Sequence, residues 1–356
     1  MRSAERAKKI LDAIWALPPQ EVCLMEVCGT HTMAIAEAGI RSLLPPAVKL
    51  LSGPGCPVCV TPPEEIDAVL ALSAEPDVIL TTYGDMLRVP GSTRGDSLLR
   101  RRALGADVRV VYSPVDAVRI AEENPQKEVV FLGVGFETTA PGTAAAVRTA
   151  AEKKVRNFSV LSLLKSVEPA IRALLAADDV RVDGFLCPGH VATIIGEEGF
   201  RFLPEEYRKP AVISGFEAED ILLSVYRLLL QIREDKPQIQ NEYRRAVAPE
   251  GNPLAKRMIQ TSFTLRPCAW RGLGVIDDSG FQLAEELTVY DAEKRFSMPK
   301  TAPVETGCRC GDVITAKIGP AECPFFGKIC TPEDPIGPCM VSSEGACAAA
   351  YKYQET

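Results

Sequence analysis

Residues 22–40 read VCLMEVCGTHTMAIAEAGI, and this stretch predicts the class of fold. Its first part, Val22 to Val27, is a short apolar run typical of a buried strand, whereas Met33 to Ile40 is expected to be helical. Cys28 and His31 lie between the two, at a strand-to-helix junction, where open α/β sheets place their ligands. The chain contains two histidines in all, so a histidine beside a cysteine at this position indicates a functional site.

A second cysteine motif follows downstream, where residues 52–62 read SGPGCPVCVTP. Cys56 and Cys59 are close enough in sequence to bind one metal ion or to close a small disulfide, and the flanking proline and glycine residues make the loop stiff. A C-x-x-C motif alone is also compatible with half of a structural zinc site or with buried thiols. Cys28 and His31 make these alternatives less favoured, and we expect a functional thiol site.

Extended apolar runs alternate with helical stretches along most of the chain. The expected strands are residues 22–27, 48–52, 78–82, 108–112, 129–134, 159–163, 184–187 and 212–215. Residues 222–233 and 238–248 are expected to be helices. Apolar, β-branched strands separated by helices predict parallel sheets that are covered on both faces.

The predicted strands divide into two equal sets, joined at residues 122–128, which contain Asn124-Pro125. We therefore expect two similar parallel-sheet, Rossmann-like α/β domains that face a cleft, and a cysteine-rich third domain. The expected limits are residues 1–124, 125–240 and 241–356. The N-terminal helix is expected to pack on the third domain.

The second histidine occurs in a motif that resembles the first. Cys187-Pro188-Gly189-His190 follows a predicted strand and precedes a predicted helix, as the segment from Cys28 to His31 does, which suggests a remote duplication. His190 is either a buried group that caps the next helix or a residue that faces His31 across the cleft. Both interpretations remain open at this point.

Residues 133–142, GVGFETTAPG, also leave a strand and open a helix. An anion could bind at such a helix N-terminus, but the nucleotide-binding fingerprints are not matched. Glycine turns are common at this position, and we favour a structural turn.

Composition excludes several classes of function. The formal net charge is −7 and there is no extended basic run, so the counterion release that drives nucleic-acid binding is not available and nucleic acid is not an expected partner. No stretch approaches the ~20 apolar residues needed to span a bilayer, and the N-terminus lacks the apolar core of a signal peptide. Twelve cysteines without a secretion signal indicate a reducing compartment, and we expect the cytoplasm.

Half of the cysteines fall near the C-terminus, namely Cys308, Cys310, Cys323, Cys330, Cys339 and Cys347. Four thiolates are what an iron–sulfur cluster or a structural zinc ion needs, which leaves two over. The spacing follows neither the compact ferredoxin pattern nor the paired C-x-x-C motifs of a zinc ribbon. Interleaved prolines and glycines are typical of a loop-rich domain whose fold depends on a metal. Cys23 and Cys268 are interpreted as core thiols.

Four motifs together resemble the HypD family of [NiFe]-hydrogenase maturation proteins. They are MEVCGTHTMAIAEAGIRSLLP at 25–45, KLLSGPGCPVCVTP at 49–62, CPGHVATIIG at 187–196 and CMVSSEGACAAAYKY at 339–353. The motifs are long and occur in the family's order over nearly the whole chain. The resemblance implies a scaffold on which the Fe(CN)2CO unit of [NiFe]-hydrogenase is assembled, and a third domain that holds a [4Fe-4S] cluster.

The resemblance also implies roles for individual residues. Cys28 and Cys59 would be the thiolate ligands of the iron, since a soft low-spin iron needs thiolates. His31 would orient a ligand or move protons, as would His190 if it faces the iron. Cys56 would pair with Cys59 in a disulfide once the iron has left.

The family's cysteine spacing assigns the cluster and a redox pair in the C-terminal region. The implied cluster ligands are Cys308, Cys323, Cys330 and Cys347, and the implied redox-active pair is Cys310 and Cys339. Cys308 and Cys310 are two positions apart, so the opposite assignment of these two remains an alternative. The cluster and the pair would pass electrons toward Cys56 and Cys59.

The implied partners are a small HypC-type chaperone that shares the iron, a HypE-type cyanide donor and, indirectly, the hydrogenase large subunit. The chain would then be a metallocentre-assembly scaffold with thiol-redox activity. The alternative from another class is a cluster-containing thiol–disulfide oxidoreductase that binds no further iron.

Overall fold

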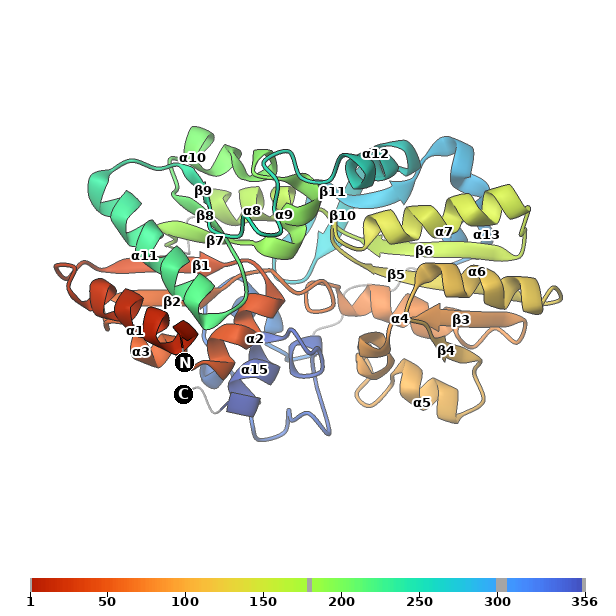
Figure 1. The fold of residues 1–356 in the computed structure, drawn as a ribbon. Helices are drawn as coiled ribbons and strands as arrows, with labels where there is room; N and C mark the ends of the chain where they lie inside the picture. Colours follow the sequence, from red (N-terminus) through yellow and green to blue (C-terminus); the bar gives the residue numbers. More distant parts are fainter. Residues whose placement is uncertain (1, 178–180, 299–305, 354–356) are drawn as a thin grey trace.

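The computed structural model describes residues 2–177, 181–298 and 306–353, and it places the strands in two parallel sheets and one hairpin (Figure 1). Sheet A contains, in spatial order, β2 (Val48–Ser52), β1 (Val22–Glu26), β7 (Gly184–Pro188), β8 (Ala211–Ser214) and β9 (Ile239–Asn241). Sheet B contains β4 (Val108–Val110), β3 (Val78–Thr82), β5 (Glu128–Gly135) and β6 (Phe158–Leu164). The antiparallel hairpin is β10 (Phe263–Trp270) and β11 (Gly274–Leu283). Each of the predicted strands is thereby confirmed.

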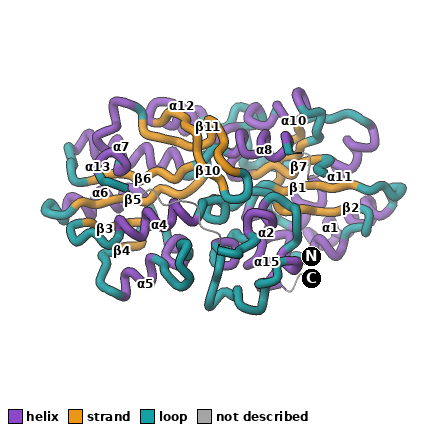
Figure 2. Tube along the Cα trace, turned by 180° about the vertical axis from the view of Figure 1, so that it is seen from behind, coloured by secondary structure: helices purple, strands orange, loops and turns teal. Residues whose placement is uncertain are grey.

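Helices connect the strands and cover the sheets (Figures 1 and 2). Those that precede β7 are α1 (Arg2–Trp15), α2 (Gly29–Glu37), α3 (Ile40–Leu43), α4 (Pro63–Leu72), η1 (Gly84–Arg88), α5 (Leu98–Ala103), α6 (Pro114–Glu123), α7 (Ala140–Lys153) and α8 (Val167–Ala176). Those that follow it are α9 (Gly189–Ile195), η2 (Glu198–Phe200), α10 (Phe202–Glu206), α11 (Ala218–Glu234), α12 (Pro253–Ser262), η3 (Glu285–Tyr290), α13 (Ala292–Arg295), α14 (Cys310–Ile314), η4 (Pro320–Glu322), η5 (Pro338–Met340) and α15 (Ala346–Tyr353).

The central strand β5 shows why the sheets are buried on both faces. Val129 and Phe131 pack in one hydrophobic cluster with helices α6 and α7, whereas Val130 and Leu132 pack in another with helix α4. Alternate residues of a strand point to opposite faces, so a continuous apolar run places apolar side chains on both. Burial of each such side chain contributes roughly 1.5–3 kcal/mol. The predicted two-sided coverage of the parallel sheets is confirmed.

The strands are not divided between the sheets as predicted. The sequence suggested that strands before residue 124 form one sheet and strands after it another. Instead, β1 pairs with β7 in sheet A, and β3 pairs with β5 in sheet B. The local pattern of apolar residues indicates that a strand is buried, but it does not indicate which strand lies beside it. The chain therefore crosses from sheet A to sheet B and back again.

The N-terminal helix also differs from its predicted place. Helix α1 packs along α11 on sheet A rather than on the C-terminal region, and Ile14 lies in one hydrophobic cluster with Val225 and Leu228. Arg6 pairs with Glu219 at the edge of the same contact. The apolar face of α1 packs against the apolar face of α11. The sequence of either helix alone does not reveal this partner.

The predicted helix at 238–248 is wrong. Residues 239–241 form β9, which pairs with β8 at the edge of sheet A, and the chain then turns. The Asn241 side chain donates a hydrogen bond to the carbonyl of Val247 and accepts one from the backbone N–H of Tyr243. Strand pairing and this side-chain bridge outweigh the helix propensity of the segment.

The region after residue 241 is shared between the two sheets. Hairpin β10–β11 packs on sheet B, where Ser162 Oγ donates to the carbonyl of Phe281 over 2.6 Å. Residues 306–353 instead lie below sheet A, where helix α15 is beside α2 in both views (Figures 1 and 2). The two parts also contact each other, since Trp270 of the hairpin lies in one hydrophobic cluster with Cys310 and Ile314.

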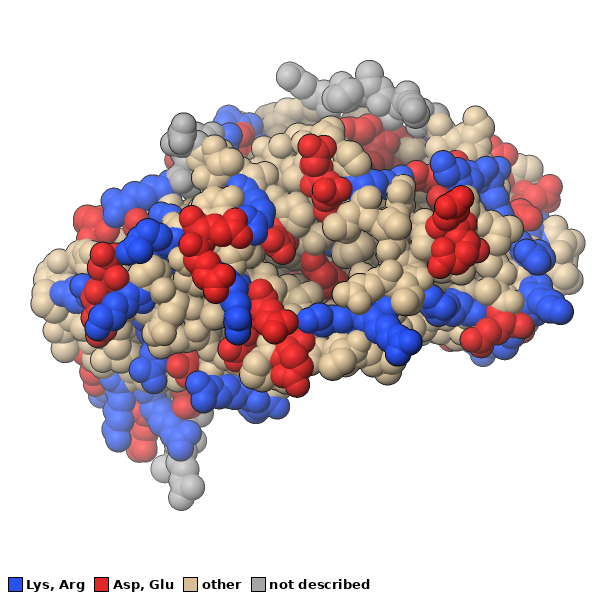
Figure 3. Space-filling model, turned by 90° about the horizontal axis from the view of Figure 1, so that it is seen from above, with Lys and Arg blue, Asp and Glu red and all other residues tan. Residues whose placement is uncertain are grey.

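Acidic and basic side chains are intermixed over the face shown in Figure 3, without a broad patch of one sign. Across the residues that the structure describes, no helix is both long and apolar enough to cross a membrane.

The sheet order predicts that residues 1–124 do not fold alone. This fragment contains β1 and β3 but lacks their central partners β7 and β5. We expect the fragment to show no cooperative thermal transition by circular dichroism, whereas the full chain does. A cooperative transition in the fragment would contradict the strand order described here.

Candidate functional site

The carboxyl ends of three neighbouring strands of sheet A form the candidate site. Strand β1 leads to Cys28 and into helix α2, β7 leads to His190 in helix α9, and β8 leads to Phe216. Because parallel strands end at the same edge of a sheet, these segments meet there. The two similar motifs thus lie side by side on one sheet, and the expectation that His31 and His190 face each other from separate sheets is wrong.

Phe216 lies between the two histidines. Its ring centroid is 4.8 Å from that of His31 and 4.0 Å from that of His190. His31 is fully buried, and its Nε2 donates to the carbonyl of Gly215 over 2.9 Å, which fixes the proton on Nε2. Burial lowers the pKa of His31 to about 4, so the ring is neutral at pH 7. Its Nδ1 has no hydrogen-bond partner within the described part of the chain.

Glu26 is a buried carboxyl group directly beneath Cys28. One oxygen accepts a hydrogen bond from the backbone N–H of Cys28 over 3.0 Å, and the other accepts one from Thr32 Oγ1 over 2.5 Å. Burial raises the pKa of Glu26 to about 7. Sequence reasoning missed this residue, although an acidic residue inside the apolar run of β1 was a signal that it has a specific partner.

The two predicted cysteine motifs contact each other through their backbones. The N–H of Gly53 donates to the carbonyl of Glu26 over 2.8 Å, and the N–H of Gly29 donates to the carbonyl of Gly55 over 3.0 Å. A Cβ atom on Gly55 would overlap the backbone of Val27 and Cys28. The glycines of the second motif therefore permit the loop to lie directly on the first motif.

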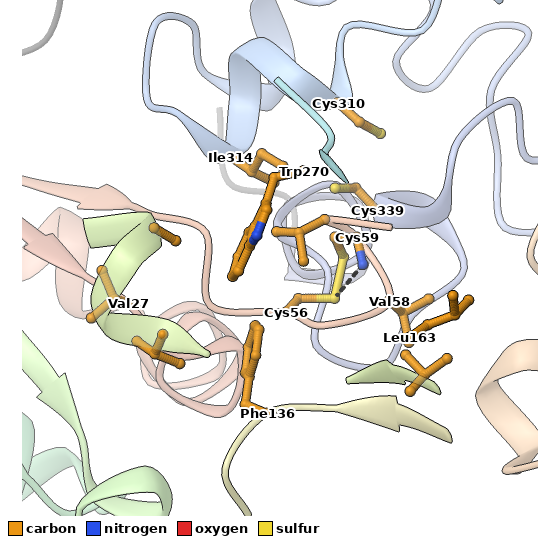
Figure 4. Packing of buried hydrophobic residues seen from close by; sticks show 14 of the residues in the cluster. Val27, Cys56, Val58, Cys59, Phe136, Leu163, Trp270, Cys310, Ile314 and Cys339 are labelled. Atoms are coloured by element: carbon orange, nitrogen blue, oxygen red, sulfur yellow. Dashed lines mark hydrogen bonds between the residues drawn. A yellow bond between two sulfur atoms is a disulfide. The ribbon is translucent and has the colours of Figure 1, made fainter. Parts of the chain in front are cut away.

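Cys56 and Cys59 form a disulfide in this structure, and the backbone N–H of Cys59 points to Cys56 Sγ at 3.1 Å (Figure 4). Cys59 is fully buried. The loop is held from the other side by the hairpin, since the N–H of Arg271 donates to the carbonyl of Val60 and its guanidinium donates to the carbonyl of Thr61. These hydrogen bonds hold both ends of the C-x-x-C loop against neighbouring segments.

A cavity of about 200 Å³ lies at the edge of sheet A and contains Cys28, His190 and Glu344 in its wall. Cys28 is buried, and burial, with the charges of Glu344 and Glu26 adding to it, raises the pKa of its thiol to about 12. Thr30 Oγ1 donates to Glu344 over 2.7 Å, which fixes that carboxylate at the wall. Among the described residues His31, Cys56 and Cys59 do not line this cavity, although Pro57 does.

The segment GVGFETTAPG supplies the opposite wall of the same cavity through Phe136, Thr138 and Thr139. Sequence reasoning favoured a purely structural turn, and the structure gives this turn a place at the site. The adjacent Glu137 accepts hydrogen bonds from Ser166 Oγ and from the N–H of Val167, which ties the ends of β5 and β6 together. The cavity therefore lies between sheet A and sheet B.

The C-terminal cysteines come together beside the disulfide loop. A small void of about 10 Å³ is lined by Cys308, Cys310, Cys323, Cys330 and Cys347. Within the described residues, no three histidine, cysteine or acidic side chains surround a single metal position. Backbone N–H groups approach two of the sulfurs, from Cys310 to Cys308 at 3.3 Å and from Ile336 to Cys330 at 3.4 Å, as is common at iron–sulfur sites.

Cys339 connects this group to the disulfide. It is fully buried and is hydrogen-bonded to the thiols of Cys310 and Cys347, and those contacts raise its pKa. Figure 4 places Cys339 between Cys59 and Cys310. On the same segment, Ser342 Oγ lies 3.3 Å from Cys56 Sγ. The predicted pair of Cys310 and Cys339 is therefore in contact, and it lies next to the C-x-x-C loop.

The comparison with known proteins agrees with these motifs. The family model for HypD, described as "Hydrogenase formation hypA family", matches residues 5–354. The chain belongs to the HypD family. It is 46% identical over 344 residues to the hydrogenase maturation factor HypD2 of Bradyrhizobium diazoefficiens, covering 94% of this chain and 90% of that protein. It is 44% identical over 362 residues to HypD of Rhizobium leguminosarum bv. viciae, covering 99% and 94%.

HypD of Escherichia coli K12 is 44% identical over 334 residues, which cover 93% of this chain and 89% of that protein. The predicted family is thus confirmed, and this HypD chain is a hydrogenase maturation factor. The residues matched by the family model include both sheets, the disulfide loop and the C-terminal cysteines.

Gly55 gives a direct test of the contact between the two motifs of this HypD chain. Gly55→Ala should reduce the free energy of unfolding by roughly 2–3 kcal/mol, because the added Cβ overlaps backbone that side-chain movement does not relieve. Gly142→Ala is the matched control, since a Cβ there has ordinary contacts at 3.8 Å or more and lies in helix α7. Urea denaturation measures both. Equal stability of the two variants would contradict the close approach of the loops.

Proposed function

We propose that the chain holds the iron of the Fe(CN)2CO unit at the cavity between the sheets, with Cys28 and Cys59 as thiolate ligands. Cys28 lies in the cavity wall, and the backbone contact between the two motifs keeps the C-x-x-C loop against it. This contact is the observation that carries the proposal. Soft iron that bears cyanide and carbonyl favours sulfur ligands, and binding of a cation offsets the burial that otherwise keeps Cys28 protonated.

Cys59 would alternate between two states: it is bonded to Cys56 in the disulfide, and it is a free thiol that can bind iron after reduction. Two electrons and two protons convert the Cys56–Cys59 disulfide to two thiols, and only then is Cys59 available to iron. Oxidation of the Cys56–Cys59 dithiol back to the disulfide would supply the two electrons needed to release cyanide from a thiocyanate carrier. One dithiol and one thiocyanate give a disulfide, the carrier thiol, cyanide and one proton, so atoms and electrons balance.

The Cys310–Cys339 pair would restore the dithiol. Its two thiols would become a disulfide as the Cys56–Cys59 disulfide is reduced, and Cys339 lies beside Cys59 (Figure 4). The neighbouring sulfurs suit a [4Fe-4S] cluster in donor type, with Cys308, Cys323, Cys330 and Cys347 as the proposed ligands. A bound cluster would supply single electrons to this pair.

The neutral imidazole of His31 and the exposed ring of His190 are also part of the proposal. His31 donates through Nε2 to Gly215, which leaves Nδ1 as an acceptor for a proton. His190 lines the cavity and would face a bound ligand there. We also propose the cytoplasm as the compartment, a HypC-type chaperone and a HypE-type cyanide donor as partners, and the hydrogenase large subunit as the final acceptor. The expected reducing compartment suits the many unpaired thiols of the described chain.

The buried Cys56–Cys59 disulfide beside Cys339 also supports the alternative, a thiol–disulfide oxidoreductase that contains a cluster but no iron cargo. Infrared bands of metal-bound cyanide and carbonyl on the protein isolated with its partners distinguish the two functions. Only the assembly scaffold gives these bands.

The iron site predicts a selective loss in Cys28→Ser. The variant should fold and keep its cluster content but lose the infrared bands of the iron unit, because an alcohol is a much poorer ligand for soft iron. Cys23→Ser is the matched control, since Cys23 is on strand β1, which leads to Cys28, and lies outside the cavity wall. Normal iron loading in Cys28→Ser would refute the ligand assignment.

The cluster site predicts that metal binding supports the C-terminal fold. Cys347→Ala should lose iron and inorganic sulfide on analysis of anaerobically purified protein, and residues after about 300 should become protease-sensitive, because binding energy contributes to folding. Cys310→Ala should keep the cluster, since Cys310 belongs to the proposed redox pair. A brown Cys347→Ala protein with unchanged digestion, or a colourless Cys310→Ala protein, would contradict the assignment.

A further inference from the structure

A lysine is buried at the end of β6, and it does not line the cavity of the proposed iron site. Lys165 is fully buried, and its Nζ lies 2.9 Å from Cys268 Sγ, 2.9 Å from the carbonyl of Ala269 and 3.3 Å from Glu65 Oε2. The ammonium is also 5.8 Å from the centroid of the Trp270 ring. A buried amine is costly unless it is paired, and these groups provide the pairing.

Cys268 faces this amine at the contact distance of a hydrogen bond. Burial raises the pKa of the Cys268 thiol, and the positive charge of Lys165 opposes that effect. A nearby cation favours the thiolate, which is the form of cysteine that peroxides oxidise. Glu65 accepts from Lys165 on the other side, so it is placed to take a proton from the amine. The sulfur of Cys268, the amine of Lys165 and the carboxyl group of Glu65 are thus in contact.

Small oxidants have a route to this pair. A cavity of about 410 Å³ has Glu65 and Arg266 in its wall, and Glu65 Oε1 is 3.9 Å from Cys268 Sγ. The cavity lies on the side of Glu65, which is partly exposed, whereas Lys165 is behind it. A molecule the size of hydrogen peroxide in the cavity is therefore separated from the sulfur by one side chain.

We propose that Lys165 and Cys268 are a site of oxidative modification, at which a peroxide converts the pair to an N–O–S bridge between Nζ and Sγ. One amine, one thiol and two molecules of hydrogen peroxide give one bridge and three molecules of water. Nitrogen and sulfur lose two electrons each, and each peroxide accepts two. The ammonium first gives one proton to Glu65 and becomes the amine. One hydrogen of the amine and the hydrogen of the thiol then end in the water that forms.

The geometry favours an oxygen bridge over a direct bond between nitrogen and sulfur. The present separation of 2.9 Å is close to the span of one bridging atom. A direct bond would require both side chains to move inward, and both are packed in the interior, where such movement is costly. The bridge would join residues 103 positions apart and would link β6 to hairpin β10–β11. The same hairpin holds the disulfide loop through Arg271.

Peptide mapping of the full-length chain tests this site. The anaerobically purified, reduced protein is treated with increasing hydrogen peroxide, its remaining thiols are blocked under denaturing conditions, and it is digested with trypsin without reductant. We expect a pair of peptides joined between Lys165 and Cys268, heavier by one oxygen and lighter by two hydrogens than the separate peptides. Trypsin should not cleave after Lys165 in this product, and dithiothreitol should release the two peptides.

Three variants act as controls. Lys165→Arg keeps the positive charge but lacks the primary amine, and Cys268→Ser lacks the sulfur, so neither should give the joined peptides. Cys23→Ser should give them at the wild-type yield. Recovery of Cys268 as a free thiol or a sulfinic acid, unattached to Lys165, at a peroxide concentration that oxidises Cys23 would overturn the proposal. A joined peptide that lacks the added oxygen would overturn the bridge. Peptide mapping of the wild-type protein tests for the bridge even where a variant does not fold.

Discussion

The contact between the peptide backbones at Gly55 and Cys28 is the constraint on which the site depends. No side chain fits between the two loops, and the hydrogen bonds from Gly29 to Gly55 and from Gly53 to Glu26 fix their register. The buried carboxyl group of Glu26 then binds the backbone of Cys28 from below. The cysteine motif is therefore held by main-chain geometry, which leaves its sulfur, rather than its backbone, to take part in chemistry.

The elements of the fold were largely predictable from the sequence, but their arrangement was not. The central strands of the two parallel sheets, such as β5 and β7, are apolar on both faces, so their burial is visible in the sequence. The order of strands depends on contacts between distant segments, and periodicity carries no information about it. For this reason β1 was assigned to a different sheet from β7, and His190 was placed opposite His31 rather than beside it. Segment 238–248 was mistaken for a helix for a related reason, since its structure depends on pairing with β8.

The candidate site shows the same division between local and distant information. Cys28, His31 and the C-x-x-C motif were found because their residue types are rare and their spacing is chemically meaningful. Phe216, which separates the two histidines, has no such signal, because an aromatic residue after a strand is usually part of the core. Glu344 becomes significant only when residues 306–353 fold back onto helix α2. Their positions required the tertiary structure.

The composition of sheet A has a consequence for the order in which the protein is made. The backbone N–H of Cys23 binds the carboxylate of Asp183, 160 residues later in the chain, and β9 follows later still. At typical rates of translation, β1 and β2 wait roughly 10–30 s on the ribosome before the strand that joins them to the rest of the sheet is synthesised. The cysteines of both N-terminal motifs are thus among the first thiols to emerge and among the last to be enclosed. During that interval they are accessible to any metal ion or chaperone near the nascent chain.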